Sequence, residues 1–200
     1  MKPVLKLDGC SYEAAKYAVE HWHYSGRMLT SKAVKIGVWE NDVFIGCVIF
    51  SRGANNRIGR PYALAQTEVC ELTRVALTTH QTPVSRIISI AIRLLKSASP
   101  GLRLIVSYAD EQSQGHHGGV YQSGNWLYVG QSQAQREVIV NGAVMHKRTA
   151  NSLFGTIVGL EKSDVLWKHK YLYALDETLR RKLESLRQPY PKRTLANKAT

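Results

Sequence analysis

The sequence lacks any apolar run long enough to cross a membrane, and it has few cysteines. A membrane span needs about 20 consecutive apolar residues, and no stretch of this chain approaches that length. The first residues, Met1 to Lys6, contain no apolar segment of the kind that a signal peptide requires. Cys10, Cys47 and Cys70 lack the CxxC spacing of metal and redox motifs, which predicts free thiols in a reducing compartment. We therefore expect a cytoplasmic protein that does not contact a membrane.

Negative charge is also scarce. The chain has 15 Asp and Glu residues against 27 Lys and Arg residues, which gives a formal net charge of +12. A surface with this charge attracts polyanions, with nucleic acid as the leading candidate, although an ordinary soluble basic protein has the same property. The length suits a single domain whose core needs no disulfide. We expect this domain to span residues 1–187, and residues 188–200 to form a mobile basic tail.

The middle of the chain predicts a strand, a helix and a second strand. Residues 69–77 largely alternate apolar and polar side chains, as a strand with one buried face does. Apolar residues then recur at helical spacing over residues 84–95, and Pro100 and Gly101 end that helix. Residues 102–109 form a second β-rich run. A crossover of this kind joins two parallel strands.

This crossover also predicts where a ligand would bind. The first turn of its helix contains Ser85 and Arg86, and it offers free backbone N–H groups and the positive end of the helix dipole to an anion. Ligands of open α/β sheets gather at the carboxyl ends of the strands, where the loop before the helix and Asp110 both fall. Glu71 and Arg74 lie on one edge of the first strand, where they can simply pair with neighbouring side chains.

The remaining elements follow from local signals. The pair Asn41-Asp42 predicts a tight hairpin, and Gly46 indicates a bulge or a close backbone approach. Residues 146–148 are expected to extend an Asn141-Gly142 hairpin with basic charge, and residues 151–164 to be irregular. The other expected elements are helices over 11–22, 120–125 (with Tyr121 and Asn125 on one face) and 177–186, and strands over 35–40, 43–50, 127–129, 138–140, 143–145 and 167–175.

Two short stretches concentrate residue types that are used in catalysis and metal binding. Residues 21–24 place two histidines and two aromatic side chains at a helix exit, and Asp110 is followed by His116 and His117 between glycines. Aspartate and histidine are common ligands of divalent metals. Adjacent histidines rarely both bind one metal, and aromatic residues at a helix end also close a core, so these stretches alone leave a metal site open.

Basic residues in loops are candidates for contacts with nucleic acid. The loop of residues 51–62 combines arginines with glycine and asparagine, which suits contacts to phosphates or bases and equally suits a solvated turn. The preferred phosphate contacts are Arg52, Arg57, Arg60, Lys147 and Arg148.

Six blocks of the sequence stand out as motifs: His23–Ser25, Phe50–Ala54, Cys70–Ala76, Thr82–Arg86, Ser107–Asp110, and His116–Gln122 followed by Asn125-Trp126. Together they resemble the Mom family of bacteriophage DNA adenine modification proteins. The order of elements also resembles the GNAT acyltransferase superfamily. This resemblance implies an α/β fold: a single GNAT-like domain with a mixed, mostly antiparallel sheet, a central parallel β–α–β crossover and flanking helices.

The resemblance also implies an activity. Members of the family attach a small amide-bearing (methylcarbamoyl, acetamido-type) group to the exocyclic amine of adenine in double-stranded DNA, which protects phage DNA from restriction nucleases in the cytoplasm of the bacterial host. Acetyl-CoA or a related acyl donor and a ferrous ion (Fe²⁺) are the implied cofactors. The usual GNAT pyrophosphate loop contains glycines, whereas residues 79–86 contain none.

The expected site residues follow from these motifs. A set of carboxylate, imidazole and phenolate ligands suits iron better than structural zinc. We expect His23, Tyr24, Ser85, Asp110 and Tyr121 to be catalytic, Val75, Leu77, Ser85 and Arg86 to bind the donor, and Asp110, His23, Tyr24, His116 and His117 to be the metal ligands.

Other functions fit the same residues. The chain has the pattern of a GNAT N-acetyltransferase acting on a protein or small amine, and its charge suits a non-catalytic DNA-binding protein. The cluster of Asp110, His116 and His117 gives weaker support for a metal-dependent nuclease. The oligomeric state stays open, with a homodimer as one option.

Overall fold

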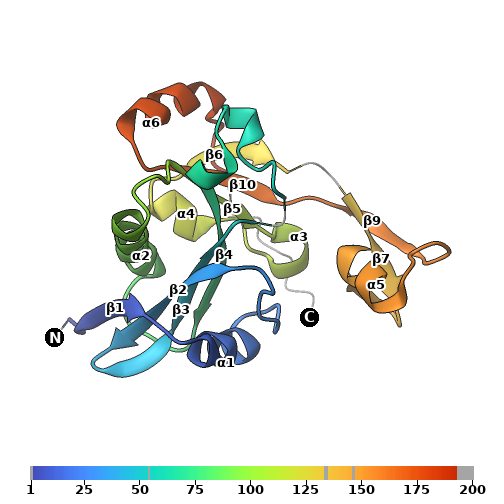
Figure 1. Cartoon of the computed structure of the whole chain (residues 1–200), viewed down its shortest axis with the longest axis horizontal. Coiled ribbons are helices and arrows are strands. Elements are labelled where there is room, and N and C mark those ends of the chain that lie inside the picture. The colour runs from blue at the N-terminus through green and yellow to red at the C-terminus, as the bar shows by residue number, and fades with distance from the viewer. Residues whose placement is uncertain (1, 54, 133–134, 146, 193–200) are drawn as a thin grey trace.

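The main body of the protein is built on one large mixed sheet. In the computed structural model, residues 2–53, 55–132, 135–145 and 147–192 are described (Figure 1). The 7-stranded sheet has the order β1-β2-β3-β4-β5-β10-β6, and of its described pairings only that of β4 with β5 is parallel. The expected fold class is therefore confirmed. The strands are β1 (Leu5–Gly9), β2 (Ala33–Glu40), β3 (Val43–Ser51), β4 (Val69–Leu77), β5 (Leu104–Ala109), β6 (Leu127–Gln131) and β10 (His169–Ala174).

Helices cover both faces of this sheet. Successive residues of β3 point to opposite faces. Cys47 and Ile49 pack with α1, whereas Val48 and Phe50 pack in the larger cluster that contains α2. The short α3 and α4 follow β5, and no helix in the described parts of the chain is long and apolar enough to cross a membrane. The helices of the main body are α1 (Tyr12–Trp22), α2 (Val84–Ala98), α3 (Glu111–Gln114), α4 (Gly119–Ser123) and α6 (Glu177–Leu183), with the 3₁₀ turns η1 (Arg60–Tyr62), η2 (Gln66–Glu68) and η3 (Glu184–Leu186).

Local signals in the first half of the chain are confirmed. Ser11 caps α1, because its Oγ accepts a hydrogen bond from the N–H of Ala14 at 3.1 Å. Asn41 and Asp42 have φ angles of 51° and 64°, as a tight β2–β3 hairpin requires. Gly46 marks the predicted close approach: a Cβ there would lie 2.0 Å from the carbonyl oxygen of Ala76.

The parallel strands β4 and β5 separate soon after they meet. They pair only from Val69 to Glu71 on β4, so the rest of β4 has β3 as its strand neighbour in the described chain. Just beyond the last pair, the Oγ of Ser107 lies 3.0 Å from the carbonyl oxygen of Leu72. This side chain bridges the strands where their backbones part, and the separation opens the sheet at the carboxyl end of β4.

A second unit, which we call the arm, comprises the 3-stranded sheet β8-β7-β9 and helix α5. Figure 1 shows the arm projecting from the main body, with β9 leading into β10. Val138 and Ala150 are buried in it. The arm consists of β7 (Gln135–Val140), β8 (Ala143–Met145), α5 (Lys147–Phe154) and β9 (Lys162–Leu166).

The arm corrects part of the sequence interpretation. Residues 151–164, expected to be irregular, contain the end of α5 and the start of β9. Lys147 and Arg148 begin α5 and do not extend the hairpin, and His146 lies outside the described residues. The glycines of the segment, Gly155 and Gly159, both have positive φ, but they follow the helix and do not interrupt it.

Three other expectations need correction or refinement. The helix expected over 120–125 ends at Ser123, and Asn125 is outside it with a φ of 58°. The N-terminal strand β1 was not anticipated by any local signal. At the other end, Gln188 donates its backbone N–H to the carbonyl of Tyr128 at 2.8 Å, and the Tyr190 hydroxyl donates to that of Trp126 at 2.6 Å. The chain is thus held beyond residue 187 by these bonds, and residues 193–200 of the predicted tail (188–200) lie outside the described residues.

Candidate active site

The exit of α1 places a neutral histidine beside an exposed aromatic ring. The Nδ1 of His23 accepts the backbone N–H of Ser25 at 3.1 Å and lies 2.9 Å from the Oγ of Ser25. Burial and the nearby charge of Arg74 lower the pKa of His23 to about 4. A neutral ring that accepts at Nδ1 carries its proton on Nε2, an assignment that follows from the hydrogen-bond pattern. His23 is therefore set up as a hydrogen-bond donor at Nε2.

Tyr24 supplies the exposed ring. Its side chain is 61% exposed, and its ring centroid lies 4.3 Å from that of His23. Exposed tyrosine rings offer a flat apolar surface with a polar tip, on which another planar group can stack.

Arg74 of β4 carries an unused donor at this place. Its Nη1 donates to the carbonyl oxygen of Thr73 at 2.8 Å, but its buried Nε has no hydrogen-bond partner among the described residues. Burial lowers the pKa of Arg74, while Tyr24 and Glu71 lie close enough to oppose that shift. Unsatisfied buried donors are rare in folded proteins, so a donor of this kind beside an exposed aromatic ring is a candidate contact for a bound molecule. The sequence offered Arg74 only as a pairing residue, because its depth in the fold is not visible in a strand pattern.

Tyr121 of α4 forms part of the buried wall of this site. Its Oη lies 2.8 Å from the Oγ of Ser107 on β5, and burial raises its pKa to about 12. The Tyr121 ring contacts those of His116, Trp126 and Tyr171 at centroid distances of 5.7, 5.1 and 5.0 Å. The phenol is therefore neutral and fixed, and Tyr24 is near enough to influence its pKa.

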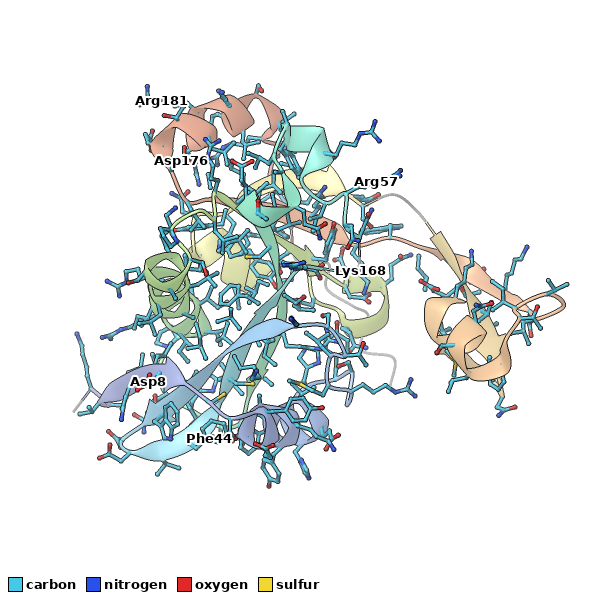
Figure 2. All side chains as sticks on the ribbon, in the orientation of Figure 1. Asp8, Phe44, Arg57, Lys168, Asp176 and Arg181 are labelled. Carbon is cyan, nitrogen blue, oxygen red and sulfur yellow. The ribbon has the colours of Figure 1, made fainter. Side chains whose placement is uncertain are left out.

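Asp110 stands at the end of β5 and is ion-paired. Its Oδ2 lies 3.2 Å from the Nζ of Lys168, and its side chain is only 12% exposed. Lys168 lies near the centre of the view in Figure 2. It belongs to the connection from the arm to β10, which also donates the backbone N–H of Trp167 to Gln112 Oε1 at 2.7 Å. Lys168 had no sequence signal, because 58 residues separate it from Asp110.

The adjacent buried His169 holds α3 in place. Its Nε2 lies 2.7 Å from Glu111 Oε2 and its Nδ1 2.9 Å from the Tyr128 hydroxyl. Trp167, Lys168 and His169, which lead from the arm into β10, therefore bind the three consecutive residues that follow β5.

The paired histidines lie in a loop that is pinned to the core. Burial lowers the pKa of His116, the neighbouring His117 lowers it further and Asp110 opposes this. The hydroxyl of Tyr171 donates to the carbonyl oxygen of His117 at 2.6 Å. Gly118 has a φ of +90°, and a Cβ there would lie 2.4 Å from the Tyr171 ring. Glycine is therefore required where this loop crosses the ring.

These residues do not fit the expected iron site. No group of three His, Cys, Asp or Glu side chains able to hold a metal occurs within the described residues. Asp110 is paired with Lys168, and His23 presents a protonated Nε2 where a metal needs a lone pair. Among the described residues, His116 and His117 complete no group of three such side chains with them.

Ser85 and Arg86 lie at a different place, on the first turn of α2. Ser85 is half-buried, Arg86 is exposed, and both line a groove of about 350 Å³ between α2 and the end of α4. Trp126 and Tyr173 also line this groove, and the ring of Trp126 contacts that of Tyr121. The predicted donor residues Val75 and Leu77 are on β4 beyond its pairing with β5, and both pack partly buried against the main core. No described contact joins Ser85 directly to His23, Tyr24 or Asp110.

The loop before α2 already holds an anionic side chain. The carboxylate of Glu40, at the end of β2, accepts the backbone N–H groups of Gln81 and Thr82 at 2.9 and 2.8 Å and the Thr82 hydroxyl at 2.6 Å. The Thr82 hydroxyl and the Gln81 N–H lower the pKa of Glu40. Two amides that precede the helix are thus occupied from inside the protein, which the sequence did not indicate.

Three of the five expected phosphate contacts are exposed. Arg52, Arg57 and Arg60 lie in the loop after β3, and Arg57 is labelled in Figure 2. This loop reaches the site, since a Cβ on Gly53 would lie 2.7 Å from Glu71 Oε2. Lys147 is half-exposed at the start of α5, and the side chain of Arg148 lies outside the described part of the structure.

Comparisons with known proteins agree on the sequence family and on the fold. A model of the Mom protein family matches residues 4–192. The methylcarbamoylase Mom of Escherichia phage Mu is 25% identical over 204 residues, which cover 94% of this chain and 84% of that protein.

The similar solved structures are acetyltransferases. A GNAT-family acetyltransferase from Streptococcus pneumoniae superposes with a TM-score of 0.51 at 12% identity, over 86% of this chain and 100% of that one. A protein of Acinetobacter baylyi assigned as an acetyltransferase gives 0.51 at 12% identity, over 88% and 94%. At these identities the structures show a shared fold, which is the GNAT fold.

Proposed function

Because the chain belongs to the Mom protein family, we propose that it attaches a methylcarbamoyl group to the exocyclic amine of adenine in double-stranded DNA and so protects phage DNA from host restriction nucleases. The observation that carries this proposal is the unused Nε of Arg74, buried beside the exposed ring of Tyr24 and the neutral His23. The Tyr24 ring offers a stacking surface for a purine. The N–H groups of Arg74 and His23 can donate hydrogen bonds to that purine and to the reactive end of the molecule that supplies the transferred group. The formal net charge of +12 suits a DNA substrate.

The adenine amine is stacked inside the duplex, so the base must leave the helix to be modified. Tyr24 offers the surface on which it would stack, and the exposed Arg52, Arg57 and Arg60 would hold the flanking phosphates. The Nε2–H of His23 would donate to a ring nitrogen of the extruded base.

The chemistry needs one bond formed, one broken and one proton removed. We take the donor to be a methylcarbamoyl thioester of the CoA type: the amine nitrogen attacks its carbonyl carbon, the C–S bond breaks, the thiolate leaves, and a proton leaves the nitrogen. The lone pair of this nitrogen is delocalised into the ring, so the amine is a weak nucleophile and the negative charge on the donor must be stabilised. We assign that task to Arg74 Nε, and the proton to the carboxylate of Asp110, which Lys168 orients.

We propose an acyl-CoA-type donor whose anionic part lies along the groove of Ser85 and Arg86. The backbone N–H of Arg86 bonds to the carbonyl of Pro83 at 2.9 Å, so the N–H groups of the first turn that can face an anion are those of Val84 and Ser85, and Arg86 contributes its exposed positive charge. Glu40 occupies the amides of Gln81 and Thr82, so the contacts to the donor fall on Val84 to Arg86. The donor would reach the amine through the opening between β4 and β5, past Val75 and Leu77. Since the residues do not fit iron, no step is assigned to a metal.

The test is the composition of DNA from cells that make the protein. Plasmid DNA is digested to nucleosides and analysed by mass spectrometry, with Arg74→Ala and Asp110→Asn as variants. We expect a modified deoxyadenosine with the wild type and a loss of at least about 100-fold with either variant. Unmodified deoxyadenosine from well-expressing wild-type cultures would contradict the proposal.

The shared fold favours a second candidate, an N-acetyltransferase acting on a protein or small amine. It predicts that the purified protein acetylates generic amines with acetyl-CoA in the absence of DNA. A third candidate, a non-catalytic DNA-binding protein, predicts strong duplex binding with unmodified nucleosides in the same experiment.

A further inference from the structure

The arm carries an apolar surface that its own small core does not use. Leu153 and Phe154 at the end of α5 are 63% and 53% exposed, and Val158 in the following loop is 88% exposed. Val138 and Ala150, by contrast, are fully buried between the arm's helix and sheet. Contiguous apolar side chains left in water usually mark a surface that binds something.

The opposite end of the same helix carries positive charge. Lys147 and Arg148 occupy the first turn of α5, where the positive end of the helix dipole disfavours cations. At the other end, the N–H of Gly155 bonds to the Asn151 carbonyl at 2.9 Å, and its φ of +72° turns the chain away. The helix therefore ends abruptly after its two exposed apolar residues. Helix α5 therefore has two basic residues at its start, although the helix dipole disfavours them there, and two exposed apolar residues at its end. This combination suits a partner that has both phosphates and stacked rings.

The arm stands at the edge of the candidate active site. Strand β9 of the arm ends at Leu166. The two residues that follow contact the site: Trp167 donates its backbone N–H to Gln112 of α3, and Lys168 is ion-paired with Asp110. Figure 1 shows the arm standing out from the main body beyond α3. A duplex bound with one base in the site would pass close to this arm.

Resting on the proposed function, we propose that the arm binds the DNA duplex and that Leu153 and Phe154 insert into the base stack from which the adenine is extruded. Proteins that unstack or kink DNA insert leucine or phenylalanine side chains between base steps, while cations hold the adjacent phosphates. Filling the vacated space keeps the extruded base from returning. A second copy of the chain is the other possible occupant of the apolar surface, but it would give no reason for Lys147 and Arg148 at the start of α5.

The experiment compares a double variant, Leu153→Ala with Phe154→Ala, with Val43→Ala. Val43 is 63% exposed on the β2–β3 hairpin and serves as the matched control. All variants should keep the wild-type melting temperature, because the side chains removed are solvent-exposed. A duplex with 2-aminopurine in place of adenine reports base extrusion as a rise in fluorescence, and anisotropy of a labelled duplex reports binding.

We expect the wild type and Val43→Ala to raise the fluorescence. The double variant should bind the duplex within about threefold of wild type and lose most of the rise. It should also modify duplex DNA at least about 10-fold more slowly while modifying single-stranded DNA at the wild-type rate, since no gap needs filling there.

Three results would overturn the proposal: an unchanged fluorescence rise in the double variant, an equal loss of activity on duplex and single strand, or a wild-type dimer that the double variant converts to a monomer in light scattering. Failure of the proposed function gives a different result, since the wild type then modifies neither form of DNA. The fluorescence rise still tests the insertion in that case.

Discussion

Replacing Gly118 with alanine should displace the loop that holds His116 and His117. Its φ of +90° lies in the left-handed region, and the new Cβ would lie 2.4 Å from the Tyr171 ring. The backbone strain costs about 1–2 kcal/mol, and the forced repacking about 1–3 kcal/mol. The matched control is Gly115→Ala in the same loop, with a φ of +61° and nothing within 4 Å of its Cβ. Only the strain applies there.

The two variants should therefore differ by the repacking term, of which about 2 kcal/mol is the middle value. For a chain of this length that difference separates their melting temperatures by about 4–8 °C. Calorimetry of both variants beside the wild type measures it. DNA modification should fall further in Gly118→Ala than in Gly115→Ala, because the loop position changes as well as the stability. Equal melting temperatures for the two variants would refute the reasoning.

Three further predictions follow from the site. Arg74→Lys keeps the charge and removes the Nε donor, so modified deoxyadenosine should fall by about 10²–10³-fold without a lower melting temperature; wild-type levels of modification would contradict the assigned role. Glu40 has a lowered pKa in the fold, so its stabilisation is present above the unfolded pKa of about 4.3 and is lost as the pH falls through the lower folded value. The wild type should therefore lose its stability advantage over Glu40→Gln in melting curves taken from pH 6 down to 3, and a constant difference would be inconsistent with this. Lys168→Met should slow modification by about tenfold by releasing Asp110, whereas the exposed Lys162→Met should not; equal effects of the two would count against orientation by the ion pair.

The elements that could be predicted from the sequence are those with local causes. The β2–β3 hairpin depends on two residues that accept positive φ, and the β4–α2–β5 crossover on periodicity within single segments. The expectation for residues 151–164 was wrong because glycines after α5 resembled those of a loop, while the packing of Ala150 that stabilises the helix comes from the arm's sheet.

The site was only partly predictable for the same reason. Motifs gave His23, Tyr24, Tyr121 and Asp110 as candidates, a prediction that stays open, but the partners of these side chains come from distant segments. Arg74 depends on depth in the fold, and the Lys168–Asp110 pair joins the arm to β5. The iron hypothesis found no support in the described residues, because the sequence shows residue types but not the hydrogen bonds and ion pairs in which those side chains are engaged.

The carboxylate of Glu40 in the turn before α2 has a consequence for selectivity. A turn that is already neutralised by its own anion keeps its shape when empty, so an incoming molecule spends no binding energy on ordering it. The same fixed negative charge repels an anionic group more than a neutral one. We therefore expect the anionic groups of the donor to lie away from this turn, toward Arg86, and the part of the donor against the turn to be neutral.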